Sequence, residues 1–565
     1  MSENSSSLNK IGYTLIVSVV TVSVFLTPFS FRSVDDNRLT QWSWTFIDVN
    51  IIKIFLFIFL GIIIAYAFSK VSFPERYPAI FLFLSSFVIG ALLWKEPEVI
   101  VDTSRYFTQA KHLKIYGIKY FLQEWGRGIN AWTDLPLVPF LYGLIFKFLG
   151  ESRLYIQIFT TFLFSMTVVL TCKIGKILWD EETGFFAGIA LLGMPYLFTQ
   201  VPLMLVDVPT MFLLTLLIFT FIKAIDEGGI RMITFSAIAL FLAFFSKYSI
   251  WLMLSVLLII YIVYIMNKSG HRSRYIYRGG LVVLFAGFLI GIVVLLKFDV
   301  ISGQIKFLQE YQMPGLKRWE ESFVSTFVFQ IHPFITSAAL YSFYVAFKKR
   351  DLRYAIISWL IILVFVLQIK RIRYIIMVFP MLALMASYGL REIRDKGMRR
   401  FIIACAVMSS LVVAIFVYLP FLEKMSAVNL KNAGQFLNSL KIEKVEVFTL
   451  PQRKSAANPA VSVPILDLST DKNISYKYEK PPLKEWVQKS SIRFTWEYEN
   501  PEYYTMGIKD SENADAVVVI SDSDDQPLPD YVRQRLEGYH ISRVFMTVTG
   551  IFRYRTIVTV YEKFS

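Results

Sequence analysis

The sequence predicts a mainly α-helical membrane protein that crosses the bilayer many times and carries a small α/β domain at its C-terminal end. Of its 565 residues, 55% are hydrophobic and 18% are charged, whereas soluble domains carry about 25% charged residues. The shortage of charge is concentrated before residue 422, where apolar runs of spanning length recur. We therefore expect a transmembrane domain over 1–424 and a separate α/β domain over 425–565.

Thirteen apolar runs are candidate membrane spans, and flanking aromatic and basic residues extend the shorter ones. They are 11–31, 51–68, 78–95, 153–177, 184–200, 208–224, 232–247, 249–266, 279–297, 325–347, 354–369, 374–390 and 400–421.

The distribution of basic residues predicts the orientation of these spans. Lys and Arg recur in the loops after every second span, including 268–278, 348–353 and 391–400. Such loops are retained in the cytoplasm, which puts the N-terminus inside and the segments 96–152, 298–324 and 422–565 outside. The same loops account for most of the net charge of +15, so we do not expect nucleic acid as a partner.

The outer segments have internal structure. Residues 105–116 mix apolar and charged residues at helical spacing, and the apolar run 136–148 is too short to span. We expect two helices on the outer membrane face within 96–152. In the C-terminal domain, 429–440 and 531–538 read as helices, while 444–450, 514–520 and 556–561 read as strands from their β-branched content.

Two acids near the outer ends of predicted spans are candidate catalytic residues. Asp102 opens the first outer segment, and Asp207 stands in Asp207-Val-Pro209. A carboxylate near hydrocarbon is costly and often functional, and it can accept a proton or bind a metal. Because each acid also precedes an apparent helix, the alternative is that both cap helix N-termini.

Basic residues on the outer side, against the positive-inside bias, indicate an anionic ligand such as phosphate. Lys247, Arg371 and Arg373 have this placement. The alternative is binding to lipid headgroups or snorkelling at helix ends. His332, which begins a predicted outer-face span, is a candidate substrate contact, although an interfacial histidine is more often structural.

The sequence lacks the motifs that are typical of several other classes of protein. The two cysteines, Cys172 and Cys405, lie within or beside apolar runs and give neither a disulfide framework nor a metal cluster. A P-loop and an H-E-x-x-H motif are absent from the sequence.

The order of these features resembles the GT-C superfamily, and within it the group of dolichyl-phosphate-mannose–protein mannosyltransferases and lipid A aminoarabinose transferases. The resemblance covers roughly 78–390. Its pieces are Asp102-x-x-Arg105-Tyr106 with a later Gly117, the stretch 136–153, Asp207-Val-Pro209, and Arg373-Tyr374 followed by Phe379-Pro380. Many relatives carry a second acid directly after the first, where this chain has Thr103.

The resemblance implies a transferase that moves a monosaccharide, mannose-like, from a polyprenyl- or dolichyl-phosphate donor to an extracytoplasmic hydroxyl with inversion. Asp102 would be the general base and Asp207 would orient the acceptor or balance charge. The donor phosphate would lie near Lys247, Arg371 and Arg373. The other motif residues, Arg105, Tyr106 and Tyr374, would contact substrate, and no metal or other cofactor would be required.

The expected partners are the lipid-linked donor, membrane lipids, and a glycan, lipid or protein acceptor. Three alternatives remain open: a transporter or flippase of lipid-linked sugars, an oligosaccharide ligase or polymerase, and a non-catalytic scaffold. A transporter is usually built from internal repeats, and the chain shows no pair of matching halves.

Overall fold

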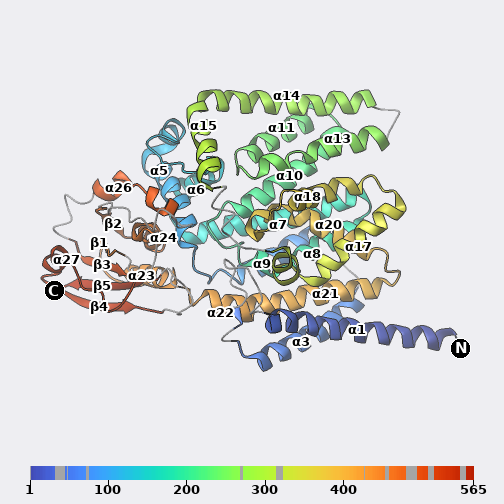
Figure 1. The fold of residues 1–565 in the computed structure, drawn as a ribbon, viewed down its shortest axis with the longest axis horizontal. Helices are drawn as coiled ribbons and strands as arrows, with labels where there is room; N and C mark the ends of the chain where they lie inside the picture. The colour runs from blue at the N-terminus through green and yellow to red at the C-terminus, as the bar shows by residue number, and fades with distance from the viewer. Residues whose placement is uncertain are drawn as a thin grey trace.

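The computed structural model shows a helical bundle with a β-sheet domain at one end (Figure 1). It describes residues 2–31, 45–46, 49–71, 76–267, 272–312, 322–425, 427–451, 457–478, 493–506, 514–547 and 555–564.

The helices of the bundle and its surface layer follow one another along the first three-quarters of the chain. They are α1 (Ser2–Phe31), α3 (Ile51–Lys70), α4 (Pro78–Ala91), α5 (Ile100–Glu124), α6 (Leu137–Phe148), α7 (Arg153–Leu178), α8 (Glu181–Leu191), α9 (Pro195–Phe198), α10 (Asp207–Asp226), α11 (Ile230–Phe244), α12 (Ile250–Met253), α13 (Val256–Asn267), α14 (Arg272–Leu296), α15 (Phe298–Phe307), η2 (Leu308–Gln312), η3 (Ser325–Gln330), α17 (Pro333–Lys349), α18 (Tyr354–Val366), α19 (Ile372–Ile375), η4 (Ile376–Val378), α20 (Phe379–Leu390), α21 (Lys396–Val413), η5 (Ala414–Tyr418) and α22 (Leu419–Leu422).

Each of the thirteen predicted spans coincides with helix, and the multi-span helical fold is confirmed. Seven spans within the described residues are long and apolar enough to cross a bilayer by length and composition, and several shorter apolar helices accompany them. Two predicted spans differ: 325–347 is broken into η3 and α17, and 184–200 is broken into α8 and α9. The latter break falls at Gly193-Met-Pro195, because proline has no backbone N–H to continue the helix.

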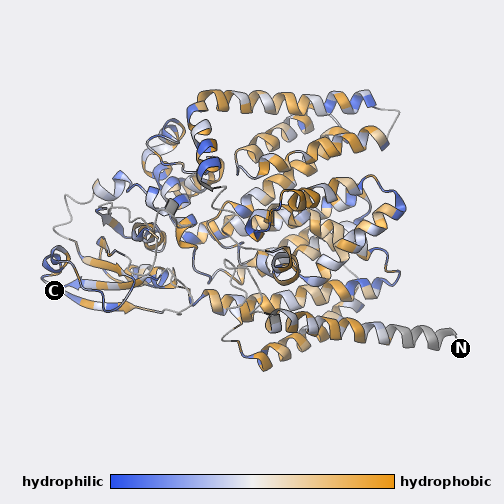
Figure 2. Cartoon of the chain, viewed as in Figure 1, coloured by the Kyte–Doolittle hydropathy of each residue, from blue (hydrophilic) through white to orange (hydrophobic). Residues whose placement is uncertain are grey.

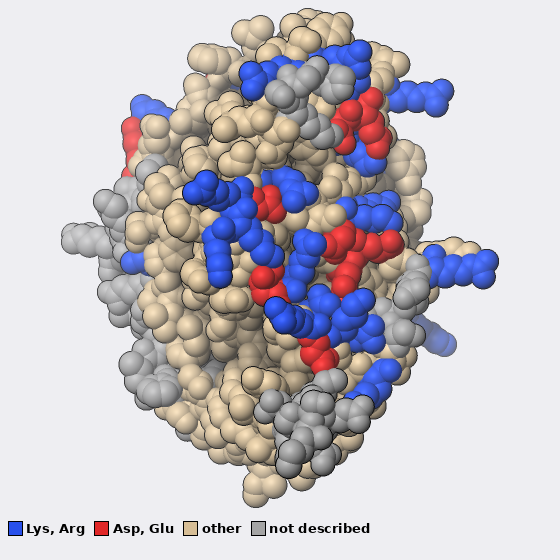
Figure 3. Space-filling model, turned by 90° about the vertical axis from the view of Figure 1, so that its right-hand side faces the viewer, with Lys and Arg blue, Asp and Glu red and all other residues tan. Residues whose placement is uncertain are grey.

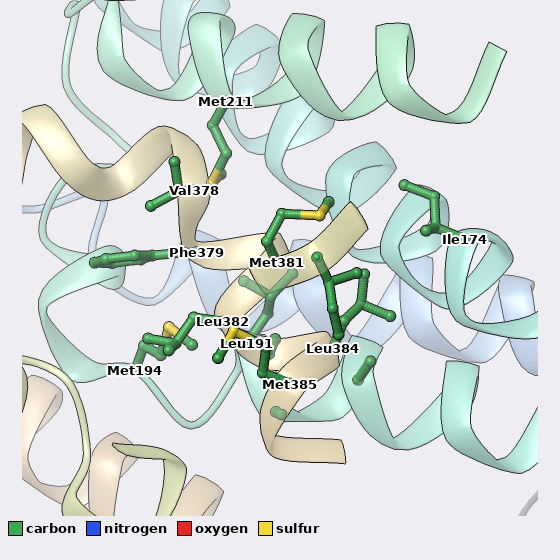
Figure 4. Packing of buried hydrophobic residues seen from close by; sticks show 14 of the residues in the cluster. Ile174, Leu191, Met194, Met211, Val378, Phe379, Met381, Leu382, Leu384 and Met385 are labelled. Carbon is green, nitrogen blue, oxygen red and sulfur yellow. The ribbon is translucent and has the colours of Figure 1, made fainter. Parts of the chain in front are cut away.

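Burial separates central helices from peripheral ones. The spans through α7, α10 and α19–α20 are 67%, 78% and 89% buried, against 28% for α3 and 17% for α14. The peripheral helices are strongly apolar on their exposed sides (Figure 2), as lipid-facing surfaces are. The central contact is packed by leucine, methionine and phenylalanine from α20 against α8 and α10 (Figure 4).

Glycines allow close approach where helices of the bundle cross. A Cβ added to Gly184 on α8 would lie 2.2 Å from the carbonyl oxygen of Cys172, and one on Gly389 would lie 2.3 Å from that of Ala338. Small residues at such crossings let helix backbones make the van der Waals contacts that hold membrane helices together.

The two helices expected within 96–152 are α5 and α6, which pack against each other. The first is longer than predicted because it continues through an interruption at Gly117, whose φ of +90° lies outside the helical region. Glycine tolerates that conformation without strain. The interruption separates the N-terminal part of α5, which holds Asp102, from a second part that leads into the loop before α6.

The C-terminal elements enclose a five-stranded mixed sheet of order β2-β1-β3-β5-β4. Its strands are β1 (Lys444–Thr449), β2 (Asn473–Tyr476), β3 (Ala516–Ser521), β4 (Tyr539–Phe545) and β5 (Ile557–Lys563), and its helices are α23 (Ala427–Ser439), η6 (Pro459–Ser462), α24 (Val463–Leu468), η7 (Arg493–Glu497), α26 (Glu502–Thr505) and α27 (Asp530–Arg535). The sequence predicted β1, β3, β5, α23 and α27 but missed β2 and β4.

The sheet domain docks on α5. Asp467, at the end of α24, accepts hydrogen bonds from Lys111 Nζ at 2.5 Å and from the Tyr504 hydroxyl at 2.6 Å. Lys111 also lies 3.0 Å from a carboxylate oxygen of Glu151. Ile100, at the start of α5, belongs to the apolar core of the sheet domain. The helix that carries Asp102 is thus fixed to the C-terminal domain by both apolar packing and buried charge.

The end of the bundle remote from the sheet gathers charge. Lys and Arg, with fewer Asp and Glu, cluster on this face (Figure 3). Pairs such as Arg353–Asp351 at 3.1 Å and Arg391–Asp180 at 2.9 Å lie in its loops.

Candidate active site

Both predicted acids lie in the first turn of a helix, but neither acts as its N-cap. The N-cap of α5 is Val99, and that of α10 is Val206. Asp102 is the third residue of α5 and Asp207 is the first of α10. Their carboxylates are therefore available for other partners, while the positive end of each helix dipole favours their charge.

Arg373 joins the two acids. Its Nη1 donates to Asp102 Oδ2, and its Nη2 and Nε lie 2.9 and 3.2 Å from Asp207 Oδ2. The structure thus brings together residues from α5, α10 and α19, and Arg373 lies 271 and 166 positions after the two acids. Asp207 is buried, whereas the side chains of Asp102 and Arg373 keep 19% and 17% of their surface exposed.

A second cation completes the Asp207 side of the cluster. Lys247, in the turn between α11 and α12, lies with Nζ 2.7 Å from Asp207 Oδ1 and 4.9 Å from the centre of the Tyr374 ring. The guanidinium of Arg371 lies 5.1 Å from the same ring, and its Nη1 donates to the Tyr374 hydroxyl at 3.4 Å. Two of the three predicted cations, Lys247 and Arg371, therefore lie against one tyrosine.

On the other side of Asp102, Arg105 bridges to a third acid. Its Nη2 lies 3.3 Å from Asp102 Oδ1 and 3.2 Å from Asp134 Oδ1, and it donates to the Tyr106 hydroxyl at 3.4 Å. Asp134 Oδ2 also accepts from Gln109 Nε2 at 3.4 Å. The two oxygens of Asp102 thus face different cations, Arg373 on one side and Arg105 on the other.

Electrostatics keeps Asp102 ionised. Burial alone would raise the pKa of its carboxyl, but Arg373 and Arg105 outweigh burial and hold the pKa well below its usual range. Burial raises the pKa of Asp134, because Arg105 offsets it incompletely and Asp102 adds to it. A carboxylate with so low a pKa is a weak base as long as both cations stay beside it.

A buried glutamate holds the backbone on both sides of this cluster. Glu98 accepts from Arg153 Nε at 2.8 Å through one oxygen. Its other oxygen accepts from the Thr103 hydroxyl and the Met204 backbone N–H, each at 3.0 Å. Thr103 follows Asp102 directly, and Met204 lies just before Asp207. One carboxylate therefore ties together the segments that carry both acids.

His332 has other partners. It is buried at the start of α17, where Nδ1 accepts from the Phe334 backbone N–H at 3.1 Å and Nε2 lies 2.9 Å from the Ser409 hydroxyl on α21. Both ring nitrogens are engaged in helix capping and helix packing, which fits the structural alternative.

Sequence reasoning missed Asp134 and Glu98. Asp134 stands in Asp134-Leu-Pro136, the same Asp-x-Pro pattern at a helix start as Asp207-Val-Pro209, and this repetition was a usable signal. Glu98 offered none, because two of its three partners, Arg153 and Met204, lie 55 and 106 positions away in the sequence. Within the described residues, no group of three or more His, Cys, Asp and Glu is placed to hold a metal ion.

Comparison with known protein families finds a match to part of the chain. Residues 134–296 match the family model described as dolichyl-phosphate-mannose-protein mannosyltransferase. This segment of the chain is therefore similar to that family of GT-C glycosyltransferases. The matched segment of the glycosyltransferase contains Asp134, Asp207 and Lys247, while Asp102 and Arg373 lie outside it. No curated protein matches the chain in sequence.

Solved structures support the fold of the glycosyltransferase. ArnT from Cupriavidus metallidurans bound to undecaprenyl phosphate matches with a TM-score of 0.53 and 11% identity, covering 86% of this chain and 98% of ArnT. Its apo form gives 0.52 and 11%, covering 85% and 97%. The archaeal oligosaccharyltransferase AglB from Archaeoglobus fulgidus, in complex with an inhibitory peptide and a dolichol-phosphate, gives 0.46 and 12%, covering 80% and 70%.

Proposed function

We propose that this glycosyltransferase transfers a mannose-like monosaccharide from a polyprenyl- or dolichyl-phosphate donor to an extracytoplasmic acceptor hydroxyl, with inversion at the anomeric carbon. The observation that carries the proposal is the largely buried cluster in which Arg373 contacts both Asp102 and Asp207. In this cluster a carboxylate lies beside several cations, which is what a general base and a phosphate leaving group require.

The leaving-group side of the reaction is assigned to Lys247, Arg371 and Arg373. As the anomeric C–O bond breaks, its electron pair goes to the lipid phosphate, which gains negative charge. Preorganised cations in a buried site stabilise charge that develops in the transition state more strongly than they would in water. Tyr374, which lies against Lys247 and Arg371, orients both cations.

Asp102 is the general base. The acceptor oxygen attacks the anomeric carbon, and its proton passes to the Asp102 carboxylate. When the donor phosphate takes Arg373, Asp102 loses its strongest cationic neighbour, and its pKa rises toward the usual range. Donor binding thereby makes the base competent in the same step that positions the sugar.

The charge balance of the cluster suits a phosphodiester donor. Three carboxylates, Asp102, Asp134 and Asp207, face four cations, Arg105, Lys247, Arg371 and Arg373. This leaves one net positive charge, which the single negative charge of a diester donor neutralises.

The charge alternation of the loops gives the membrane orientation that this reaction needs. With the basic end of the bundle (Figure 3) in the cytoplasm, the catalytic cluster, α5, α6 and the sheet domain are extracytoplasmic. The N-terminus is then cytoplasmic, and the lipid donor enters from the outer leaflet.

The test is sugar transfer from a panel of polyprenyl-phosphate monosaccharides into native membrane extract, with purified protein in liposomes. We expect one donor to be used by the wild type, and Asp102→Asn to lower the rate by about 10²- to 10⁴-fold, the range supplied by general-base catalysis. Asp530→Asn, which alters an exposed acid in the sheet domain, is the matched control. Absence of transfer from every donor, together with movement of lipid-linked sugar between leaflets, would assign the chain to the flippases instead.

A further inference from the structure

Trp132, in the loop between α5 and α6, has an unusual backbone. Its φ of +53° lies in the left-handed region, where a side chain other than glycine is strained. Two contacts hold it there: its N–H donates to Asn130 Oδ1 at 3.0 Å, and its carbonyl accepts from Gln304 Nε2 at 3.2 Å. Strain that the surroundings enforce in this way is concentrated at functional sites.

The loop around Trp132 is held from three directions. Gln304, on α15, also donates to the Asp134 carbonyl at 2.8 Å, while its Oε1 accepts from the Tyr248 hydroxyl at 2.6 Å. Asn130 Nδ2 donates to the Glu497 carbonyl of the sheet domain at 3.1 Å. Helix α15, the turn that carries Lys247, and the C-terminal domain therefore all fix the position of this loop.

The indole of Trp132 lies beside the catalytic cluster. The guanidinium of Arg105 lies 5.3 Å from its ring centre, and Arg105 lies 3.3 Å from Asp102. The ring packs in part against the core of the sheet domain and is only half-buried. A large aromatic surface therefore remains partly open next to the base.

The geometry also places Trp132 on the acceptor side of the proposed reaction. Asp102 turns one oxygen toward Arg373 and the other toward Arg105. In an inverting displacement the nucleophile and the leaving group lie on opposite faces of the anomeric carbon. With the phosphate on the Arg373 side, the acceptor enters from the Arg105 side, where Trp132 lies.

We propose that Trp132 is a specificity-determining residue on which a sugar ring of the acceptor stacks, so that the acceptor is a glycan. The proposal rests on the proposed transferase function and deepens it. An aromatic face with carboxylate and amide side chains around it matches a pyranose ring, which has an apolar face and a rim of hydroxyl groups. Asp134, Gln109 and Asn130 supply these polar groups beside Trp132. The C-terminal domain then acts by holding the platform in place.

The experiment compares wild type with Trp132→Ala and Trp132→Phe, using whichever lipid-phosphate monosaccharide the wild type consumes. Native membrane extract serves as acceptor after treatment with either proteinase or periodate, and water serves as an acceptor that has no ring. Four quantities are measured: the donor concentration and the amount of extract that give half-maximal transfer, the rate of donor hydrolysis, and the melting temperature. Trp359→Phe, at a tryptophan on α18 that bonds Ser255, is the matched control.

We expect Trp132→Ala to raise the amount of extract needed for half-maximal transfer by roughly tenfold, as loss of one aromatic contact predicts. The donor concentration for half-maximal transfer and the rate of donor hydrolysis should stay within about twofold of the wild-type values. Trp132→Phe should need nearly as little extract for half-maximal transfer as the wild type. Periodate should destroy acceptor capacity and proteinase should not.

Two results would overturn this inference while leaving the transferase function intact. Equal changes in donor and acceptor half-saturation, with a lower melting temperature, would make Trp132 a packing residue. Loss of acceptor capacity on proteinase treatment would make the acceptor a protein. If the wild type transfers no sugar at all, the proposed function itself fails.

Discussion

Replacing Glu98 by glutamine is a direct test of how the two proposed catalytic acids, Asp102 and Asp207, are held together. The carboxylate accepts three hydrogen bonds, from Arg153 Nε at 2.8 Å and from the Thr103 hydroxyl and Met204 N–H at 3.0 Å each. Glutamine keeps one acceptor oxygen and replaces the other with an NH₂ group. Whichever way the amide turns, a donor group faces a donor.

The expected loss follows from those contacts. If the amide nitrogen faces Arg153, a hydrogen bond between charged groups is lost, which is worth about 1.5–3 kcal/mol. If it faces Thr103 and Met204, the Met204 N–H loses its bond to the carboxylate, worth about 1.5–3 kcal/mol, while the Thr103 hydroxyl can rotate to accept from the amide. Either orientation lowers the free energy of unfolding by roughly 2–3 kcal/mol. The segments before Asp207 and around Asp102 also lose their common anchor, and a displacement of about 1 Å at a reacting group lowers the rate by about 10²-fold.

The assay measures the thermal melting of purified protein alongside sugar transfer at saturating donor. Glu98→Gln should melt a few degrees lower and should transfer sugar about 10- to 100-fold more slowly, with donor half-saturation nearly unchanged because the phosphate cations keep their places. The matched control is Glu310→Gln on η2, where the side chain is 67% exposed and lies 3.9 Å from Lys306, and no measurable change is expected. Unaltered melting and transfer in Glu98→Gln would refute the assignment of Glu98 as the anchor of both acids.

Three further outcomes are expected. Arg371→Met should raise donor half-saturation by about tenfold, because it removes one cation from the proposed phosphate site; unchanged donor kinetics would argue against that role. Burial raises the pKa of Asp467 to about 6, from about 4 in an unfolded chain. The folded protein therefore holds this proton more tightly, and up to about 3 kcal/mol of stability is lost as pH rises through about 4 to 6. Asp467→Asn should flatten that part of the melting-against-pH curve, and an unaltered slope would contradict the assignment. Gly126→Ala should lower the melting temperature, because its φ is +80° and the new Cβ would lie 2.2 Å from Val300 Cγ1; Val300→Ala in the same chain should recover part of the loss, and failure to do so would show that the backbone conformation alone is responsible.

Local patterns predicted most of the fold. The apolar runs located helix in every expected span, because a segment that lies in lipid must satisfy its own backbone hydrogen bonds. Strands β1, β3 and β5 were found because they are rich in β-branched residues. Strand β2 has only four residues, and β4 is mostly exposed and has no regular alternation of apolar and polar residues. These two strands owe their pairing to the rest of the sheet, which a local pattern does not contain.

The sequence revealed those residues of the candidate site whose charge is unusual at their position in a membrane protein. Arg371 and Arg373 were noticed because they lie against the positive-inside bias, and Asp102 and Asp207 because they lie near apolar runs. Glu98 and Gln304 could not be identified in this way, since their roles arise from partners more than 100 residues away. The half-buried Trp132 was equally hidden, because its left-handed backbone depends on tertiary contacts.

The contact of Arg373 with both acids also bears on how the enzyme tolerates its surroundings. A membrane surface is crowded with anionic headgroups that would occupy any bare pocket of positive charge. Here the acids already fill the coordination of Arg373 and Lys247, so an incoming headgroup must displace a carboxylate before it gains a cation. A bulk phospholipid makes few further contacts that would compensate for the lost ion pair, whereas a donor also brings a sugar whose hydroxyl groups can bind. Under the proposed function, the resting ion pairs would therefore keep common lipids from competing with a scarce substrate.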